Sequence, residues 1–224
     1  MAVTVYQLPH SPYCLPITRA LGAFGVAFDV VDISNADRGV IIRLTQGAYY
    51  QVPVLVHDGT IVHDGYAGPS DGLDVPRHID RVWGGGRLFP AEHEGVQALL
   101  VPHIEGEVEG ATFKLADIHH VPAIADLVER TMVIRHKERR FGRGCVERWR
   151  ADHGAMSAQA TALLVPFDQM LVGHPFLLGE QPVYADFALY GVLANLTFND
   201  WNPFPSGLSR LAGWFARMKV FRFD

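Results

Sequence analysis

The sequence predicts an α/β domain with the element order βαβαββα followed by an all-α domain. Three observations predict this division. Residues 1–84 mix short strand-like and helix-like apolar patterns, whereas residues 92–224 show helical spacing almost throughout. Between them, Gly84–Gly86 and the residues up to Pro90 break every periodicity, which predicts a linker over residues 85–91. The 224 residues, 49% of them hydrophobic, suffice for one large core or two small ones.

The first domain opens with a strand, a helix and a second strand. Val3–Leu8 alternates and is rich in β-forming residues, Pro9–Pro16 interrupts it, and residues 17–24 have helical spacing. Residues 27–33 then form the second strand. The remaining elements are a short helix at 41–44, strands at 52–56 and 61–63 joined by a turn at 58–60, and a helix at 75–83 that starts near Pro76.

The second domain is predicted to contain helices only. Its apolar residues recur at helical spacing, and no segment has a convincing strand pattern. The predicted helices cover residues 92–118, 121–141, 157–171, 184–198 and 206–219.

Charge and cysteine content narrow the classes of function. The formal net charge of −5 gives no global electrostatic reason to bind nucleic acid or an anionic membrane surface. No apolar stretch reaches the roughly 18 to 20 residues of a membrane span. Two cysteines, Cys14 and Cys145, are too few for a disulfide framework. We expect a cytoplasmic protein with small molecules or proteins as partners.

Two short motifs in the first domain suggest a family. Ser11-Pro12-Tyr13-Cys14 follows the first strand and opens a helix, and Val52-Pro53 leads into the predicted hairpin. These segments resemble the active-site turn and the cis-proline turn of thioredoxin-fold proteins, with serine where a glutaredoxin has its nucleophilic cysteine. With the helical second half, the chain resembles the glutathione S-transferases over nearly its whole length. Further matching segments are Leu88-Phe89-Pro90, Phe176-Leu177-Leu178-Gly179 and Ala185-Asp186-Phe187-Ala188-Leu189.

Ser11 is the predicted catalytic residue. A free thiol has a pKa of about 8.5, so most of it is protonated at neutral pH, and the attacking species is the thiolate. A serine hydroxyl at a helix N-terminus can donate a hydrogen bond to the sulfur while the helix dipole favours negative charge. The alternative is that Ser11 only caps the helix. Tyr6 and Tyr13 are alternative hydroxyl donors.

The resemblance also implies the residues that hold glutathione, the expected co-substrate. With a cis bond before Pro53, the Val52 backbone would pair with the cysteinyl part of glutathione like an added strand. A proline at a strand edge would also explain Pro53. The full set of predicted glutathione-binding residues is Tyr13, Gln51, Val52, Pro53, Ser70 and Asp71.

The contact to the γ-glutamyl end departs from the family pattern of an acid followed by serine. We prefer Asp71-Gly72 for this position, with an insertion at residues 65–70, because the linker spacing then fits. Asp64-Gly65, directly after the fourth strand, is the alternative. In both alignments glycine stands where the family has serine. The hydroxyl of Ser70 would then replace the missing serine hydroxyl. Asp71 as a simple helix cap is the other interpretation.

Several other features have two interpretations each. Cys14 is either a thiol activated near a helix start or a packed side chain. His103 with Glu105, Glu107 and Glu109, and the pair His119-His120, are interpreted as solvated helical faces and not as metal ligands. Trp201–Pro205 would line an apolar pocket or pack as a connection. In Val183-Tyr184-Ala185-Asp186, valine replaces the capping hydroxyl of the family, which concerns stability.

Residues 130–150 hold eight Arg or Lys side chains against two acids. We interpret this stretch as an extended helix partly at the cleft or at a dimer interface, because the acidic whole chain argues against nucleic acid. Its Arg-rich Phe-Gly segment resembles that of β-etherases in the same family.

The sequence therefore predicts a glutathione transferase that attacks a small hydrophobic electrophile. The helical domain would supply the apolar second pocket. From the resemblance we expect a cytoplasmic homodimer with a role in detoxification. Alternatives are a glutathione-dependent lyase or β-etherase, a thiol oxidoreductase working through Cys14, and a non-catalytic binding protein, which the glycine at position 72 makes plausible.

Overall fold

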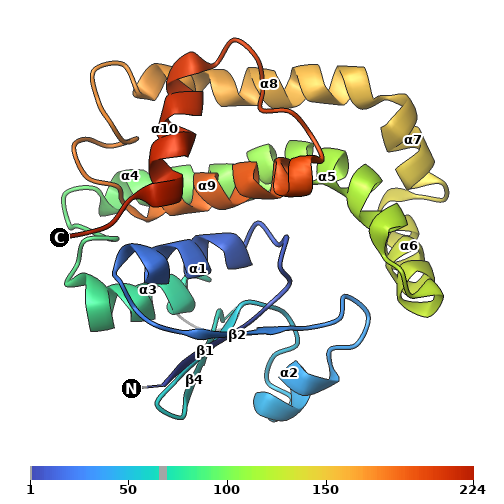
Figure 1. Cartoon of the computed structure of the whole chain (residues 1–224), viewed down its shortest axis with the longest axis horizontal. Helices are drawn as coiled ribbons and strands as arrows, with labels where there is room; N and C mark the ends of the chain where they lie inside the picture. Colours follow the sequence, from blue (N-terminus) through green and yellow to red (C-terminus); the bar gives the residue numbers. More distant parts are fainter. Residues whose placement is uncertain (1, 66–69) are drawn as a thin grey trace.

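The computed structural model describes residues 2–65 and 70–224. An N-terminal α/β unit packs beneath a layer of helices from the rest of the chain (Figure 1). The predicted element order of the first unit is confirmed. Its strands are β1 (Val3–Gln7), β2 (Asp29–Asp32), β3 (Val54–His57) and β4 (Thr60–His63), and its helices are α1 (Cys14–Ala23), α2 (Gly39–Leu44) and α3 (Asp74–Ile79), which continues as a π-helical turn at Asp80–Gly84.

The direction of the strands sets the position of the site. The sheet order is β2-β1-β3-β4, with β1 parallel to β2 and antiparallel to β3, and β4 antiparallel to β3. Strands β1, β2 and β4 therefore run the same way. Their carboxyl ends, and the residues just before β3, meet at one end of the sheet.

The hairpin between β3 and β4 has a local cause. His57 pairs with Thr60, which leaves a two-residue loop whose residues, Asp58 and Gly59, have φ of 46° and 83°. Positive φ at both central positions is the geometry of a type I′ turn, which suits the right-handed twist of strands. The Asp-Gly sequence therefore fixes the register that places Asp64 at the end of β4.

One continuous core joins the sheet to the helical layer. Val5 and Leu55 of the sheet, together with Leu21 of α1, are fully buried in the same cluster as Phe187 and Trp214 of the helical layer. A smaller cluster of Ile41, Tyr49 and Val54 packs α2 against the other face of the sheet.

The helical layer consists of α4 (Glu94–His103), a π-helical turn (Ile104–Val108), α5 (Glu109–Ala123), α6 (Leu127–Phe141), α7 (Cys145–Ala151), α8 (His153–Met170), α9 (Tyr184–Leu196), a 3-10 turn (Phe198–Asp200) and α10 (Ser209–Val220).

Two predicted helix boundaries are wrong. The break predicted between 118 and 121 lies at 124–126, where Ile124 is extended and the Asp126 side chain accepts the Glu129 amide at 2.6 Å as an N-cap. Helices also occupy 145–151 and 153–156, where none was predicted. Pro122 lies in the last turn of α5, so the helix tolerates it and ends only afterwards.

Two buried aspartates fix the connections around the helical layer. The Asp80 carboxylate accepts the Leu88 amide at 3.0 Å and the Phe89 amide at 3.2 Å, which anchors the segment after Gly84. The Asp186 carboxylate accepts the Val183 amide and two further N–H groups, so half of the expected capping box is present although residue 183 has no hydroxyl. Within the described part of the chain, no helix has the length and apolar character to cross a membrane.

Candidate functional site

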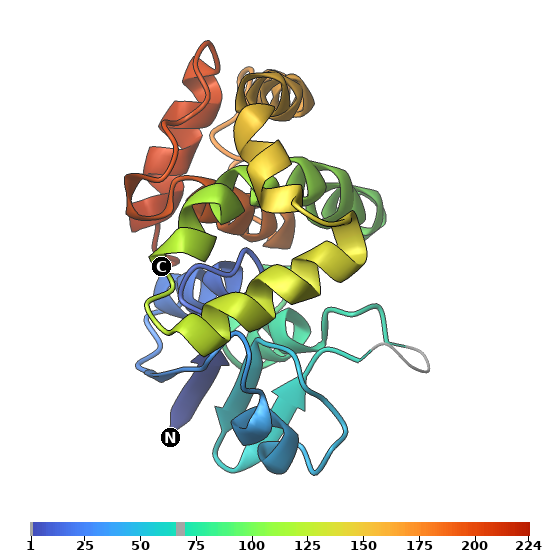
Figure 2. The ribbon, with the colours of Figure 1, turned by 90° about the vertical axis from the view of Figure 1, so that its right-hand side faces the viewer.

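A pocket of about 750 Å³ lies where the carboxyl ends of the strands face the helical layer. Helix α6 runs across this face of the molecule (Figure 2). The structure brings all predicted site residues into the wall of this one pocket. They are Ser11, Tyr13, Gln51, Val52, Pro53, Ser70 and Asp71, and the alternative Asp64 joins them.

Ser11 both starts helix α1 and faces the pocket. Its carbonyl oxygen accepts the amides of Cys14 and Leu15 at 3.1 and 3.0 Å. Its Oγ accepts the Tyr13 amide at 3.2 Å. Ser11 can therefore cap the helix and offer its hydroxyl to the pocket at the same time, because its main-chain carbonyl makes most of the capping hydrogen bonds.

The alternative hydroxyls are less well placed for thiol activation. Tyr13 donates its hydroxyl hydrogen to the carbonyl oxygen of Glu105 at 3.3 Å, which ties the Ser11 turn to the helical layer. Tyr6 packs against the Ile41 cluster beneath the sheet and does not line the pocket. Ser11 lines the pocket, and the partner of its hydroxyl hydrogen is the adjacent buried thiol of Cys14.

Cys14 is a packed thiol. Its side chain has no exposed surface, and burial raises its pKa to about 11 despite a hydrogen bond with the Ser11 hydroxyl. The activated-thiol interpretation of Cys14 is therefore not supported, because a thiol with this pKa stays protonated at neutral pH. Cys145 is also fully buried.

The segment before β3 offers a free main-chain edge. The Val52–Pro53 peptide bond is cis, and Pro53 is buried. In the described residues, neither the amide nor the carbonyl of Val52 takes part in a hydrogen bond, since the ladder with β1 starts at Val54. Val52 therefore presents one donor and one acceptor to the pocket.

The two candidate contacts to the γ-glutamyl end, Asp71 and Asp64, have different surroundings on the acidic wall of the pocket. Asp71 is already paired, because Arg77 contacts its carboxylate at 2.6 Å and bridges to Glu94 at 2.9 Å. Partial burial works to raise the pKa of Asp71, but the hydrogen bonds from Arg77 and from the Leu73 amide lower it overall.

Among the residues that the structure describes, no cation pairs with Asp64 as Arg77 does with Asp71. Its carboxylate accepts the Val75 amide at 2.9 Å, and burial raises its pKa to about 7, assisted by repulsion from Asp74 and Asp71. The geometry therefore favours Asp64 over Asp71 as the group that meets a cationic ligand.

Ser70 and Gly72 have structural roles on this wall. The Ser70 hydroxyl donates to Asp74 at 2.6 Å, and the Gly65 amide donates to the same carboxylate oxygen at 2.7 Å. Gly72 has φ of +79°, a left-handed conformation that favours glycine over serine. This explains the glycine of the Asp71-Gly72 register, whereas in the Asp64-Gly65 register a Cβ at position 65 would lie 3.3 Å from Ser70 Cβ and from the Asp74 carboxylate. Most of the predicted insertion, residues 66–69, lies outside the described residues.

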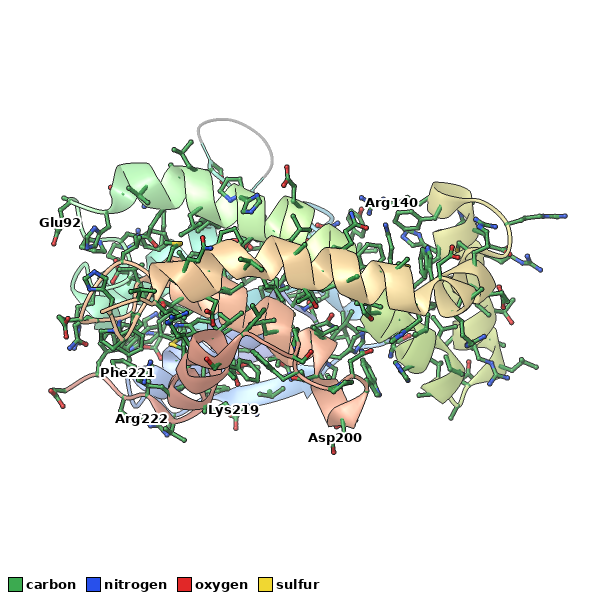
Figure 3. The ribbon with its side chains drawn as sticks, turned by 90° about the horizontal axis from the view of Figure 1, so that it is seen from above. Glu92, Arg140, Asp200, Lys219, Phe221 and Arg222 are labelled. Atoms are coloured by element: carbon green, nitrogen blue, oxygen red, sulfur yellow. The ribbon has the colours of Figure 1, made fainter. Side chains whose placement is uncertain are left out.

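The residues that line the pocket but were not assigned to the site from the sequence include the polar side chains of Arg38, Glu105, Arg140 and Tyr184. Arg38 follows β2, and its Nη1 is buried without a hydrogen-bond partner among the described residues. Arg140 lies within the basic stretch predicted partly at the cleft, near the end of α6, and it lies toward the opposite end of the helical layer from Glu92 (Figure 3). Charge was the available signal for the first three, whereas Tyr184 lies in the Val183-Tyr184-Ala185-Asp186 segment, to which the sequence analysis gave a structural role.

Histidines hold the Ser11 turn against the helical layer. The His10 ring stacks on His120 of α5 at a centroid distance of 3.8 Å, and Asn195 of α9 donates to the His10 carbonyl at 2.6 Å. Trp201 packs against both rings and does not line the pocket, so the pocket-lining interpretation of its segment is wrong. Burial lowers the pKa of His10 to about 3 and that of His120 to about 4, which keeps both rings neutral.

Comparison with known proteins supports the fold. Residues 128–217 match the glutathione S-transferase C-terminal domain family. Glutathione transferase GSTFuA3 from Phanerochaete chrysosporium is similar in structure, with a TM-score of 0.79, 13% identity and coverage of 100% of this chain and 98% of that one. No curated protein matches the sequence.

Two bacterial structures with bound ligand are also similar. Glutaredoxin 2 from Salmonella typhimurium in complex with glutathione has a TM-score of 0.73 and 18% identity, over 97% of this chain and 93% of that chain. The theta class glutathione S-transferase from Xanthomonas axonopodis pv. citri with glutathione bound has a TM-score of 0.66 and 16% identity, over 98% and 93%. At these identities the likeness concerns the fold.

Proposed function

We propose that this chain, which has the fold of the glutathione S-transferases and a C-terminal region that matches that family, binds glutathione and activates its thiol for attack on a small electrophile. The observation that carries the proposal is the position of the Ser11 hydroxyl and the unpaired Val52 main chain on one pocket, between Arg38 and Asp64. Glutathione-bound neighbours with the same fold support it.

The charges of the pocket match those of glutathione. Arg38 lies between edge strand β2 and helix α2, and Asp64 directly follows the opposite edge strand β4, so a cation and an acid both line the pocket. Glutathione carries a carboxylate at its glycyl end and an ammonium at its γ-glutamyl end. We place the glycyl carboxylate at Arg38, the cysteinyl backbone at Val52, and the ammonium at Asp64 instead of Asp71. Gln51, Pro53 and Ser70 complete the wall, as proposed from the sequence.

In this arrangement Ser11 stabilises the thiolate. Its Oγ accepts the Tyr13 amide, and its hydroxyl hydrogen, which can donate to the buried Cys14 sulfur, can turn instead to a sulfur in the pocket. Helix α1 begins at the same place and adds the positive end of its dipole. Lowering a thiol pKa by about two units requires only about 2.7 kcal/mol.

The remaining expectations from the resemblance stay part of this proposal. They are a cytoplasmic location, a role in detoxification, a hydrophobic electrophile and a homodimer. The exposed apolar side chains of Val96 and Leu99 on α4 support an interface there. Sedimentation that shows a monomer at micromolar concentration would remove the dimer from the proposal.

Calorimetric titration of glutathione tests binding. We expect micromolar to millimolar affinity, and the absence of heat at millimolar glutathione would overturn the proposal. Arg38→Gln should weaken binding of glutathione but not of γ-glutamylcysteine, which lacks the glycyl carboxylate. The matched control is Arg43→Gln, which removes a charge from the neighbouring helix outside the pocket wall.

A further inference from the structure

Glu105 reaches the proposed reaction site from the helical layer. It lies in the π-helical turn Ile104–Val108, which follows Pro102 and interrupts the long helix between α4 and α5. Its carbonyl oxygen accepts the Tyr13 hydroxyl at 3.3 Å, two residues from Ser11, and Glu105 lines both the pocket of Ser11 and the neighbouring pocket beside Arg77. Interpreting Glu105 as part of a solvated face is therefore wrong.

The next acidic residue in the turn, Glu107, differs from Glu105 in its exposure and in its partner. Glu107 is exposed and pairs with His103 at 3.2 Å on the outside of the helix. It does not line the pocket. The turn thus separates two glutamates of equal charge into one pocket carboxyl and one surface carboxyl.

Within the described chain, no ion pair neutralises the Glu105 carboxyl. Burial, with repulsion from Asp64 and Glu109, raises its pKa to about 7. A carboxyl removed from water without a cation favours its neutral form, which can donate a hydrogen. The titratable and charged groups that share a pocket with it or act on it are Tyr13, Arg38, Tyr49, Asp64, Asp71, Arg77, Glu94, Glu109, Arg140 and Tyr184.

We propose that Glu105 is the general acid that protonates an oxygen atom of the electrophile when the glutathione sulfur attacks. This inference rests on the proposed function. With an epoxide, the C–S bond forms, the C–O bond breaks, and its electron pair stays on oxygen, which takes the Glu105 proton. The thiol proton leaves to solvent when the thiolate forms, and solvent reprotonates Glu105. The net reaction adds glutathione across the epoxide.

The substrate class follows from the need for that proton. An alkoxide is a strong base, so its departure gains from a positioned acid, whereas chloride leaves without protonation. Electrophiles that develop charge on oxygen, such as epoxides, should therefore be favoured over aryl halides. This class is narrower than hydrophobic electrophiles in general.

The test compares styrene oxide with 1-chloro-2,4-dinitrobenzene. We expect Glu105→Gln to lower the ratio of kcat/KM for the epoxide over the aryl chloride by about 100-fold, the usual contribution of general acid catalysis. Glu107→Gln, with the same change of charge in the same turn, should leave this ratio unchanged. An equal loss on both electrophiles would show a structural role and overturn the proposal.

The wild-type pH profile gives a second readout that needs no variant. Relative to the aryl chloride reaction, kcat/KM for the epoxide should fall as pH rises through about 7, because the ionised carboxylate cannot donate. A constant ratio across this range would overturn the proposal. Turnover of the aryl chloride but not the epoxide would overturn it while leaving the transferase proposal intact. Turnover of neither electrophile would overturn both.

Discussion

Gly191 of α9 lies directly against Pro12 of the Ser11 turn. A Cβ at position 191 would stand 2.4 Å from the Pro12 carbonyl oxygen and 2.5 Å from Cδ of Pro16. The first atom belongs to the main chain and the second to a rigid ring, so neither can move aside cheaply. The close approach of α9 to α1 therefore requires glycine at this position.

Gly191→Ala should destabilise the protein and displace the Ser11 turn. Overpacking of this kind costs about 1–3 kcal/mol. Urea unfolding would measure the cost, and glutathione calorimetry would show weaker binding. Gly213→Ala is the control, since no atom lies within 4 Å of its added Cβ on α10. The free energy of unfolding of that variant should rise by up to about 1 kcal/mol. Equal stability of the two variants would contradict the packing argument.

Ser11→Ala should raise the pKa of the bound glutathione thiol. If the hydroxyl supplies most of a two-unit shift, the variant loses about 100-fold of its thiolate at a pH below the thiol pKa. The ultraviolet absorbance of the thiolate, followed against pH in the complex, measures this directly. Cys14→Ala removes a partner of the Ser11 hydroxyl but not the hydroxyl itself, so it should move the curve much less than Ser11→Ala does. A shift in Cys14→Ala with none in Ser11→Ala would restore the oxidoreductase alternative.

Asp64 should release a proton when the ligand ammonium binds. Burial raises its pKa to about 7 in the free protein, and a bound cation would lower that pKa. Binding therefore weakens as pH falls below about 7, since the carboxyl must first lose its proton. S-methylglutathione isolates this effect because it has no thiol to ionise. Calorimetry in buffers of different ionisation enthalpy measures the released protons.

Substitutions at the two acids separate their roles in this proton release. Asp64→Asn should abolish the release with S-methylglutathione, whereas Asp71→Asn should retain it, because Arg77 already holds the Asp71 carboxylate. Release that persists in Asp64→Asn and disappears in Asp71→Asn would restore the register preferred from the sequence.

The His10 and His120 stack should make the fold acid-sensitive. Burial lowers both pKa values, to about 3 and about 4, below the unfolded value of about 6.5. The stability contributed by the neutral rings is fully present above the unfolded pKa and is lost as pH falls toward the folded pKa. Between pH 7 and about 5, each ring should forfeit roughly 1–2 kcal/mol.

His120→Phe keeps an aromatic ring against His10 but removes one titrating group. Its free energy of unfolding should therefore fall less steeply than that of the wild type over the same pH range. His119→Phe is the neighbouring control, because His119 lies outside the stack. Identical slopes for the wild type and His120→Phe would contradict a buried neutral His120.

Local sequence predicts the elements and the two motifs that form the core of the site. Alternating apolar residues indicate a strand with one buried face, and apolar residues at helical spacing indicate a helix with one buried face. The element order βαβαββα follows from these local patterns. The Asp58-Gly59 turn fixes the hairpin, and Ser11 and Val52 lie at the ends of predicted elements. These features depend on neighbours in the chain. They could be predicted because steric and hydrophobic preferences act at short range.

Partners distant in sequence determine the rest of the site. Asp64 and Asp71 have the same local appearance, and only Arg77 and Glu94 make one of them unavailable. Glu105 and Glu107 lie in one π-helical turn, and only the packing of this turn on the Ser11 turn, where Tyr13 donates to the Glu105 carbonyl, decides which of them lines the pocket. Burial and ion pairing set the charge of a carboxyl, and both arise only when the two parts of the chain pack together.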